Sequence, residues 1–253
     1  AYACFAILEC LLQLGAAFII IIIPGNKLVW YSILILMIAL LVRFVNMLYC
    51  RLSFIECRHK GYFDKKELLT LNKINTNLPS HCDMNKTIGI DMTTGSLGQG
   101  LSCGVGMALA ARIKQDGSYV YVIIGDGELQ EGQNWEAAGF AAKQGLDNLI
   151  VFLDYNQMQI DDFTYNLIYD GKYVDKWQSF GFDAVEVDGH DHQAIIDAIE
   201  KAKSIKGKPH MIVLNTIKGK GVSFIESAKL SNHSMPITKE QLADGLKELG
   251  LEK

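Results

Sequence analysis

The chain has 253 residues, of which 49% are hydrophobic, and its formal net charge is −4 at pH 7. This length allows one large domain or two small ones, and the composition is sufficient for a substantial core. The acidic balance, with no basic block after residue 66, excludes the electrostatic footprint of a nucleic-acid-binding protein. The six cysteines form no CxxC pair, which is typical of reduced thiols in an intracellular protein and disfavours a zinc site.

The first fifty residues differ in composition from the rest of the chain. They contain only three charged side chains, whereas the remainder alternates acidic and basic residues as soluble domains do. We therefore place a boundary near residue 58. It divides the chain into an apolar segment, residues 1–58, and a second segment, residues 59–253.

Two apolar runs in the first segment, Phe5–Ile23 and Leu28–Tyr49, have the length of membrane-spanning helices. Turn residues separate them, which predicts a helical hairpin, and the basic residues that follow would place the second segment in the cytoplasm. Glu9 and Arg43 weaken this interpretation, because an ionisable group in a bilayer costs on the order of a few kcal/mol. Two alternatives stay open: buried core helices, or an aberrant N-terminus from a frame or gene-model error upstream of His59.

From Ser118 onward, short β-rich runs alternate with longer helical patterns. Near-continuous runs of Val, Ile, Leu and Tyr are typical of parallel strands that are covered on both faces. The order predicts an open α/β parallel sheet with helices on both faces, in which ligands bind at the carboxyl ends of the strands. The predicted strands are Tyr119–Ile124, Leu149–Asp154, Ala184–Val187 and Met211–Asn215, and the predicted helices are Leu97–Ile113, Glu131–Gln144, His192–Ser204 and Lys239–Leu249.

Oxygen-bearing side chains stand at the ends of two successive predicted strands. The letters GDGE, residues 125–128, follow the first strand, and the letters DYN, residues 154–156, close the second. Asp126 and Asn156 would then lie side by side and ligate Mg²⁺, which takes oxygen ligands and commonly binds phosphates as well. The backbone carbonyl of Met158 would complete the protein's share of the ligands. Gly127 would let the main chain approach a phosphate, and the helix opening near Glu131 adds N–H groups and a favourable dipole.

Four motifs occur in one order along the second segment. They are DMNKTIGIDMTTGSLGQG at 83–100, GDGELQEGQNWEAA from 125 with DYNQMQID at 154–161, VDGHD at 187–191, and TIKGKGVSF at 216–224. Together they resemble the thiamine diphosphate-binding part of transketolases, and the resemblance runs from about Gly61 to the C-terminus. It implies thiamine diphosphate and Mg²⁺ as cofactors.

The resemblance also implies roles for individual residues. Glu131 is similar to an acid that links the two cofactor sites across the family's dimer, although a helix N-terminal Glu that favours the dipole is an equal explanation. Lys218 has the alternative of a solvated lysine in a glycine turn. By resemblance, Asp126, Asn156 and the Met158 carbonyl ligate the metal, Gly127 and Lys218 contact the diphosphate, and Gly95, Ser96 and Leu97 line the cofactor near its rings.

Two histidines are candidates for contact with substrate. His81 stands where the family has a Gly-His-Pro stretch, although its neighbours here are Ser80 and Cys82. His233 stands where the family has Trp-His-Gly, here replaced by Asn-His-Ser with one extra residue before it. An imidazole there would donate to a sugar hydroxyl or move a proton. A lone surface histidine is the alternative for each.

Two features of the family are missing from this chain. Two further family histidines precede the Lys-Gly-Tyr-Phe element, and residues 1–58 hold apolar sequence in their place, which is the basis of the reading-frame hypothesis. The second domain, whose Glu polarises the aminopyrimidine, is also missing. The resemblance therefore implies a split enzyme that is inactive alone and needs a separate pyrimidine-binding chain, with the two chains forming a dimer of heterodimers.

The function predicted from these observations is that of the N-terminal subunit of a transketolase, which transfers a two-carbon ketol unit between sugar phosphates. One alternative is another thiamine diphosphate enzyme subunit, such as that of a 2-oxo acid dehydrogenase or a sugar-phosphate synthase. A second alternative, from a different class, is a non-catalytic, membrane-tethered remnant.

Overall fold

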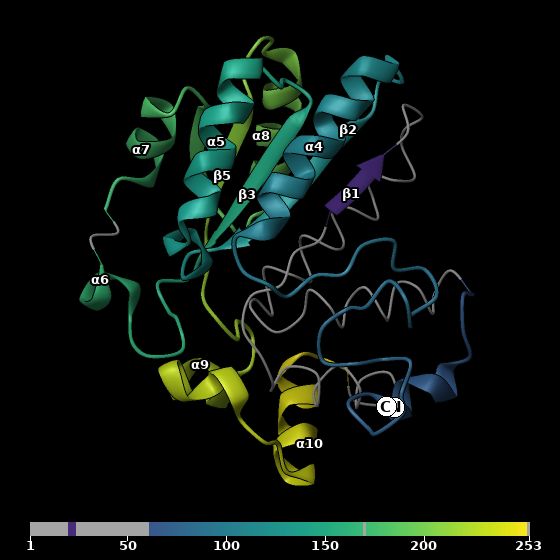
Figure 1. The fold of residues 1–253 in the computed structure, drawn as a ribbon. Helices are drawn as coiled ribbons and strands as arrows, with labels where there is room; N and C mark the ends of the chain where they lie inside the picture. Colours follow the sequence, from purple (N-terminus) through teal and green to yellow (C-terminus); the bar gives the residue numbers. More distant parts are fainter. Residues whose placement is uncertain (1–19, 24–60, 169–170, 252–253) are drawn as a thin grey trace.

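The computed structural model of the protein describes residues 20–23, 61–168 and 171–251. These residues contain a five-stranded sheet with the strand order β1-β2-β3-β5-β4 (Figure 1). The last four strands in this order are parallel to one another, and β1 pairs antiparallel with β2 at one edge. The strands are β1 Ile20–Ile23, β2 Tyr119–Gly125, β3 Leu149–Tyr155, β4 Asp183–Asp188 and β5 His210–Asn215.

Helices cover both faces of the sheet, with α4 and α5 side by side on one face and α8 on the other (Figure 1). The helices α9 and α10 lie beyond the carboxyl ends of the strands. The helices are α4 Gln99–Lys114, α5 Gly132–Gln144, α6 Thr164–Leu167, α7 Tyr173–Ser179, α8 His192–Ser204, α9 Ser223–Ala228 and α10 Lys239–Glu248, and the 3-10 helices are η1 Lys65–Thr70, η2 Glu128–Gln130 and η3 Lys229–Ser234.

The alternation of side chains along the strands divides the interior into two cores. In β2, Val120, Val122 and Ile124 pack against α4 and α5, whereas Tyr121 and Ile123 belong to the core on the α8 face. Successive strand residues point to opposite faces, so a strand that is apolar at every position serves both cores. This explains why the strands appear in the sequence as continuous apolar runs.

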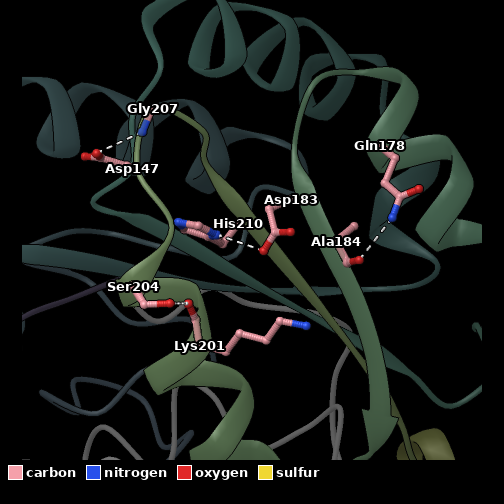
Figure 2. A network of polar contacts seen from close by, with 8 residues as sticks. All are labelled: Asp147, Gln178, Asp183, Ala184, Lys201, Ser204, Gly207 and His210. Atoms are coloured by element: carbon pink, nitrogen blue, oxygen red, sulfur yellow. Dashed lines mark hydrogen bonds and ion pairs between the residues drawn. The ribbon is translucent and has the colours of Figure 1, made fainter.

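The amino ends of the strands are fastened by polar contacts far from the carboxyl ends (Figure 2). His210 begins β5, and its Nδ1 lies 3.3 Å from a carboxylate oxygen of Asp183, the first residue of β4. The Asp147 carboxylate accepts a hydrogen bond from the Gly207 N–H at 3.0 Å, just before β5. Gln178 on α7 donates to the Ala184 carbonyl at 3.3 Å. The contact between His210 and Asp183 joins two neighbouring strands, and the other two attach a loop and the helix α7 at the same end of the sheet.

The structure confirms the predicted parallel α/β sheet with helices on both faces. The predicted strands and helices are present, with boundaries that differ by a residue or two. The helix α4 begins at Gln99 rather than at the predicted Leu97, because Gly98, with a φ of 84°, lies outside the helix. A left-handed residue cannot continue a right-handed helix, so the glycine sets the boundary.

The apolar N-terminal helical hairpin is not supported. Within the first apolar run, Ile20–Ile23 form the strand β1, and the rest of the 1–58 segment lies outside the described residues. Four β-branched residues in succession favour a strand, and pairing satisfies the backbone groups at the edge of β2. No helix in the described part of the chain is long and apolar enough to cross a membrane.

A matched pair of glycines on α4 tests how closely this helix packs on the sheet. A Cβ at Gly104 would lie 2.4 Å from Cγ2 of Val122, whereas a Cβ at Gly106 would meet nothing within 4 Å. We expect Gly104→Ala to lower the free energy of unfolding by ~1–3 kcal/mol through overpacking. We expect Gly106→Ala to raise it by up to ~1 kcal/mol through helix propensity. Urea denaturation followed by circular dichroism measures both, and equal shifts would contradict the packing explanation.

Candidate functional site

The carboxyl ends of β2 and β3 bring the two predicted metal ligands into neighbouring loops. Gly125 pairs with Asp154 in the parallel register, and Asp126 and Asn156 follow within two residues. The Asp126 N–H donates to the Asp154 carbonyl at 3.2 Å. In return, the Gln157 N–H donates to Oδ2 of Asp126 at 2.6 Å. The two strand tips are therefore joined by hydrogen bonds in both directions.

Each of these side chains is held in a fixed orientation. Oδ1 of Asp126 accepts a hydrogen bond from the Gly127 N–H at 2.8 Å. The amide of Asn156 donates through Nδ2 to Oδ2 of Asp154 at 3.0 Å and accepts through Oδ1 from the Met158 N–H at 3.1 Å. A carboxylate or amide oxygen has two lone pairs, so each oxygen retains capacity for a cation.

Two buried acids, Asp126 and Asp154, and one buried base, Lys218, interact with one another at the tips. Burial, followed by the nearby Asp154 charge, raises the pKa of Asp126 well above its ordinary range. Burial also raises the pKa of Asp154 to about 7. Lys218 is only 5% exposed, and burial lowers its pKa to about 8 although both carboxylates favour its charged form. If both carboxyls were ionised, their negative charge would exceed the positive charge of the one Lys218 ammonium.

The donor set at these tips fits a hard divalent cation. The Asp126 carboxylate and the Asn156 amide oxygen are oxygen ligands that Mg²⁺ accepts when phosphate supplies others. Met158, whose N–H donates to the Asn156 side chain, follows directly, and its carbonyl as a third ligand stays a prediction. The deficit of positive charge points the same way, because a bound cation would relieve the repulsion between the two acids.

Gly127 lies where the two loops touch. A Cβ at this position would come within 2.9 Å of Cβ of Gln159, in the loop after β3. Only glycine allows this contact without displacing Gln159. The predicted approach of the Gly127 backbone to a phosphate is compatible with this packing and stays a prediction.

Glu128 is a functional candidate that the sequence did not reveal. It is 1% exposed, and its Oε1 accepts from the Gly98 N–H at 2.9 Å while its Oε2 accepts from the Gly125 N–H at 3.3 Å. One carboxylate thus joins the tip of β2 to the loop that precedes α4. Burial raises its pKa to about 7, despite these two hydrogen bonds, which favour the charged form.

The hydrogen bond between Glu128 and Gly98 holds the preceding residues 95–97, the loop predicted to line the cofactor rings, near the carboxyl ends of the strands. His81 is exposed, and its ring packs on this loop, because a Cβ at Gly95 would lie 2.1 Å from Cδ2 of His81. Glu131 is exposed as well and flanks Gly98, whose added Cβ would lie 2.8 Å from Cβ of Glu131. The Glu131 side chain makes no capping hydrogen bond to α5.

Lys218 and His233 meet on the other side of the tips. Nζ of Lys218 lies 3.0 Å from Nδ1 of His233, which belongs to η3. Burial first, and then the Lys218 charge, lower the pKa of His233 to about 4, so the imidazole is neutral near pH 7. An ammonium donates and cannot accept, so Nδ1 is the acceptor and the ring hydrogen is on Nε2. This Nε2 is buried without a hydrogen-bond partner among the described residues.

The described structure therefore gathers the predicted residues at one edge. Asp126, Asn156, Gly127 and Lys218 lie at the tips themselves, while Gly95, Glu131 and His81 adjoin them through the loop before α4. In α/β domains with an open parallel sheet, ligands bind beyond the carboxyl ends of the strands, which is where these residues lie. The roles of the individual residues stay predictions.

Comparison with known proteins identifies the family. The family model described as the transketolase thiamine diphosphate-binding domain matches residues 45–253. The chain is 54% identical over 190 residues to a 6-deoxy-6-sulfo-D-fructose transketolase subunit of Clostridium sp. (strain MSTE9), covering 75% of this chain and 69% of that protein. It is 40% identical to one of the subunits of an apulose-4-phosphate transketolase from Actinobacillus succinogenes, covering 70% and 63%. The chain belongs to the transketolase family, through its thiamine diphosphate-binding domain.

Solved structures agree with this assignment. A transketolase from Campylobacter jejuni superposes with a TM-score of 0.68 at 28% identity, over 74% of this chain and 30% of that one. A transketolase from Pichia stipitis superposes with a TM-score of 0.67 at 32% identity, over 73% and 29%. The chain thus spans about a third of these solved transketolases and about two thirds of the relatives that are named as subunits.

The Glu128 bridge gives a prediction that needs neither cofactor nor partner. In Glu128→Gln, one of the two acceptor oxygens becomes an NH₂ group that faces a backbone N–H, so one buried donor loses its acceptor. We expect the free energy of unfolding to fall by ~1–3 kcal/mol. Glu136→Gln, on an exposed position of α5, is the matched control and should change stability by less than ~0.5 kcal/mol. Urea denaturation measures both variants, and indistinguishable midpoints would rule out the bridge.

Proposed function

We propose that this chain is the cofactor-binding subunit of a two-chain transketolase, which uses thiamine diphosphate and Mg²⁺ to transfer a two-carbon ketol unit between sugar phosphates. The observation that carries the proposal is the pair of hydrogen-bonded strand tips, where Asp126, Asn156 and the buried Lys218 converge. The family membership of the chain supports the identity of the cofactor.

The chain's own residues would divide the work of holding the cofactor. Asp126, Asn156 and the Met158 carbonyl would ligate the metal. Lys218 would neutralise charge on the diphosphate, and Gly127 would admit the diphosphate close to the main chain. Gly95, Ser96 and Leu97 would line the rings, because the Glu128 bridge holds their loop at the same edge.

When bound, thiamine diphosphate supplies a carbanion and an electron sink for cleavage and formation of the carbon–carbon bond beside a ketose carbonyl. The residues of this chain would bind and orient the sugar. His233 holds its hydrogen on the buried Nε2, where it would be donated to a substrate oxygen. His81, exposed beside Gly95, would contact a sugar hydroxyl from the rim.

The partner would be a separate chain that supplies the pyrimidine-binding domain. Relatives of this chain are named as subunits of transketolases, which supports a two-chain enzyme. By the family resemblance, Glu131 would link two cofactor sites in a dimer of heterodimers. Its exposure and its lack of a capping bond to α5 leave its carboxylate available for such a contact.

The donor sugar that we propose is 6-deoxy-6-sulfo-D-fructose. The support is the 54% identity to a subunit named for this substrate, compared with 40% identity to a subunit named for apulose 4-phosphate. A sulfonate resembles a phosphate in shape but carries one negative charge. A site for it would need fewer cations than a site for a phosphate.

The metal-ligand assignment is tested with the reconstituted pair of subunits. We expect Asp126→Asn to weaken thiamine diphosphate binding in the presence of Mg²⁺ by at least ~100-fold, because even the outer partners of a metal ligand are worth ~10–100-fold. Asp244→Asn, on an exposed position of α10, is the control and should bind as the wild type does. Titration calorimetry measures both, and equal affinities for wild type and Asp126→Asn would exclude Asp126 as a ligand.

The choice of substrate is tested by donor competition. With the same acceptor aldose in both assays, the reconstituted pair should transfer a two-carbon unit to it from 6-deoxy-6-sulfo-D-fructose faster than from fructose 6-phosphate, as measured by the shortened aldose that the donor leaves. Turnover of pyruvate instead would support a 2-oxo acid dehydrogenase. Failure of the wild-type pair to bind thiamine diphosphate would support the non-catalytic remnant.

A further inference from the structure

The loop that carries Lys218 begins directly after β5 and is held at two consecutive residues. The Thr216 N–H donates a hydrogen bond to the Tyr155 carbonyl at 3.1 Å, and the Thr216 hydroxyl donates one to Oδ1 of Asp154. The next residue, Ile217, donates its N–H to Nε2 of His190 at 2.8 Å. The backbone is therefore held at the position that immediately precedes Lys218.

His190 reaches this loop from a tight turn after β4. The Gly189 N–H donates to the Asn215 carbonyl at 2.9 Å, and the His190 N–H donates to Oδ1 of Asp188 at 2.8 Å. A Cβ at Gly189 would lie 2.6 Å from Cγ2 of Thr216. The turn therefore packs against the end of β5, and this contact fixes the backbone position of His190.

The hydrogen bond from Ile217 determines the form of the imidazole. A backbone N–H can only meet a lone pair, so Nε2 of His190 carries no hydrogen and the ring hydrogen is on Nδ1. A side chain that offers no acceptor at this position would leave the Ile217 N–H without its protein partner. An acceptor of similar reach, such as Oε1 of a glutamine, would preserve the bond.

We propose that His190 is a positioning residue for Lys218. Its ring anchors the Ile217 backbone, and this anchor keeps the Lys218 ammonium beside the carboxylates at the strand tips and 3.0 Å from His233. His190 thus acts on the ammonium through the main chain of the neighbouring residue. The consequence for cofactor affinity rests on the proposed function of Lys218 at the diphosphate.

The experiment compares His190→Leu, which removes the acceptor, with His190→Gln, which restores one at similar reach. His192→Leu is the matched control, because His192 is an exposed residue at the start of α8, two positions away. His190→Asn, polar but too short to reach Ile217, replaces His190→Leu should the leucine variant not fold.

The first readout is amide hydrogen exchange of residues 216–220 in the full chain without cofactor. We expect exchange at Ile217 on the order of 10-fold faster in His190→Leu, since a typical hydrogen bond contributes about that factor. His190→Gln and His192→Leu should exchange as the wild type does. Unchanged protection in His190→Leu, or no recovery in His190→Gln, would overturn the proposal.

The second readout is the affinity of the reconstituted pair for thiamine diphosphate with Mg²⁺. We expect His190→Leu to weaken it ~10-fold, since the lost hydrogen bond contributes about that factor, and His190→Gln to recover it. Wild-type affinity in His190→Leu would overturn the positioning role. If the wild-type pair binds no cofactor, the proposed function fails instead, and hydrogen exchange at Ile217 still decides whether His190 anchors the loop.

Discussion

The structure depends on the hydrogen bond from the Gln157 backbone to the Asp126 carboxylate, which closes the gap between two parallel strand tips. The bond is made possible by Gln157, whose φ of 64° turns the chain back toward β2 immediately after β3. A left-handed conformation is costly for a residue with a side chain, so the surrounding contacts must stabilise it. The tips of the two strands are thus joined, and Lys218 reaches them from the loop that follows a third strand, β5.

The site combines buried charges that would be unstable alone. Asp126 and Asp154 are both out of water, and burial raises the pKa of both although the nearby Lys218 charge lowers it, so the two acids would be fully ionised together only with a further cation beside them. Burial of unbalanced charge is costly, and native proteins retain it where a ligand completes the balance. At the amino ends of the strands, by contrast, the polar groups are paired with one another: Asp183 with His210, and Asp147 with the Gly207 N–H (Figure 2).

The sequence predicted the parallel sheet and the gathering of the site residues well, because both follow from local rules. Continuous apolar runs identify buried strands, and the residues after successive strands must share one edge. Three features could not be predicted in this way. Glu128 and His190 act on backbone amides from segments distant in sequence, and no residue pattern encodes such a contact. The strand β1 was hidden in an apolar run whose length suggested a helix, and only its pairing with β2 distinguishes the two.

Both hydrogen bonds that the Glu128 carboxylate accepts come from main-chain N–H groups, those of Gly98 and Gly125, and neither involves a side chain of residues 95–97, the loop predicted to line the cofactor rings. The position of that loop is consequently independent of what Ser96 and Leu97 display. The side chains at these two positions can change while the loop stays anchored, provided that the carboxylate and the two glycines remain. A family that acts on chemically different sugars gains from this separation, since recognition can diversify without loosening the framework.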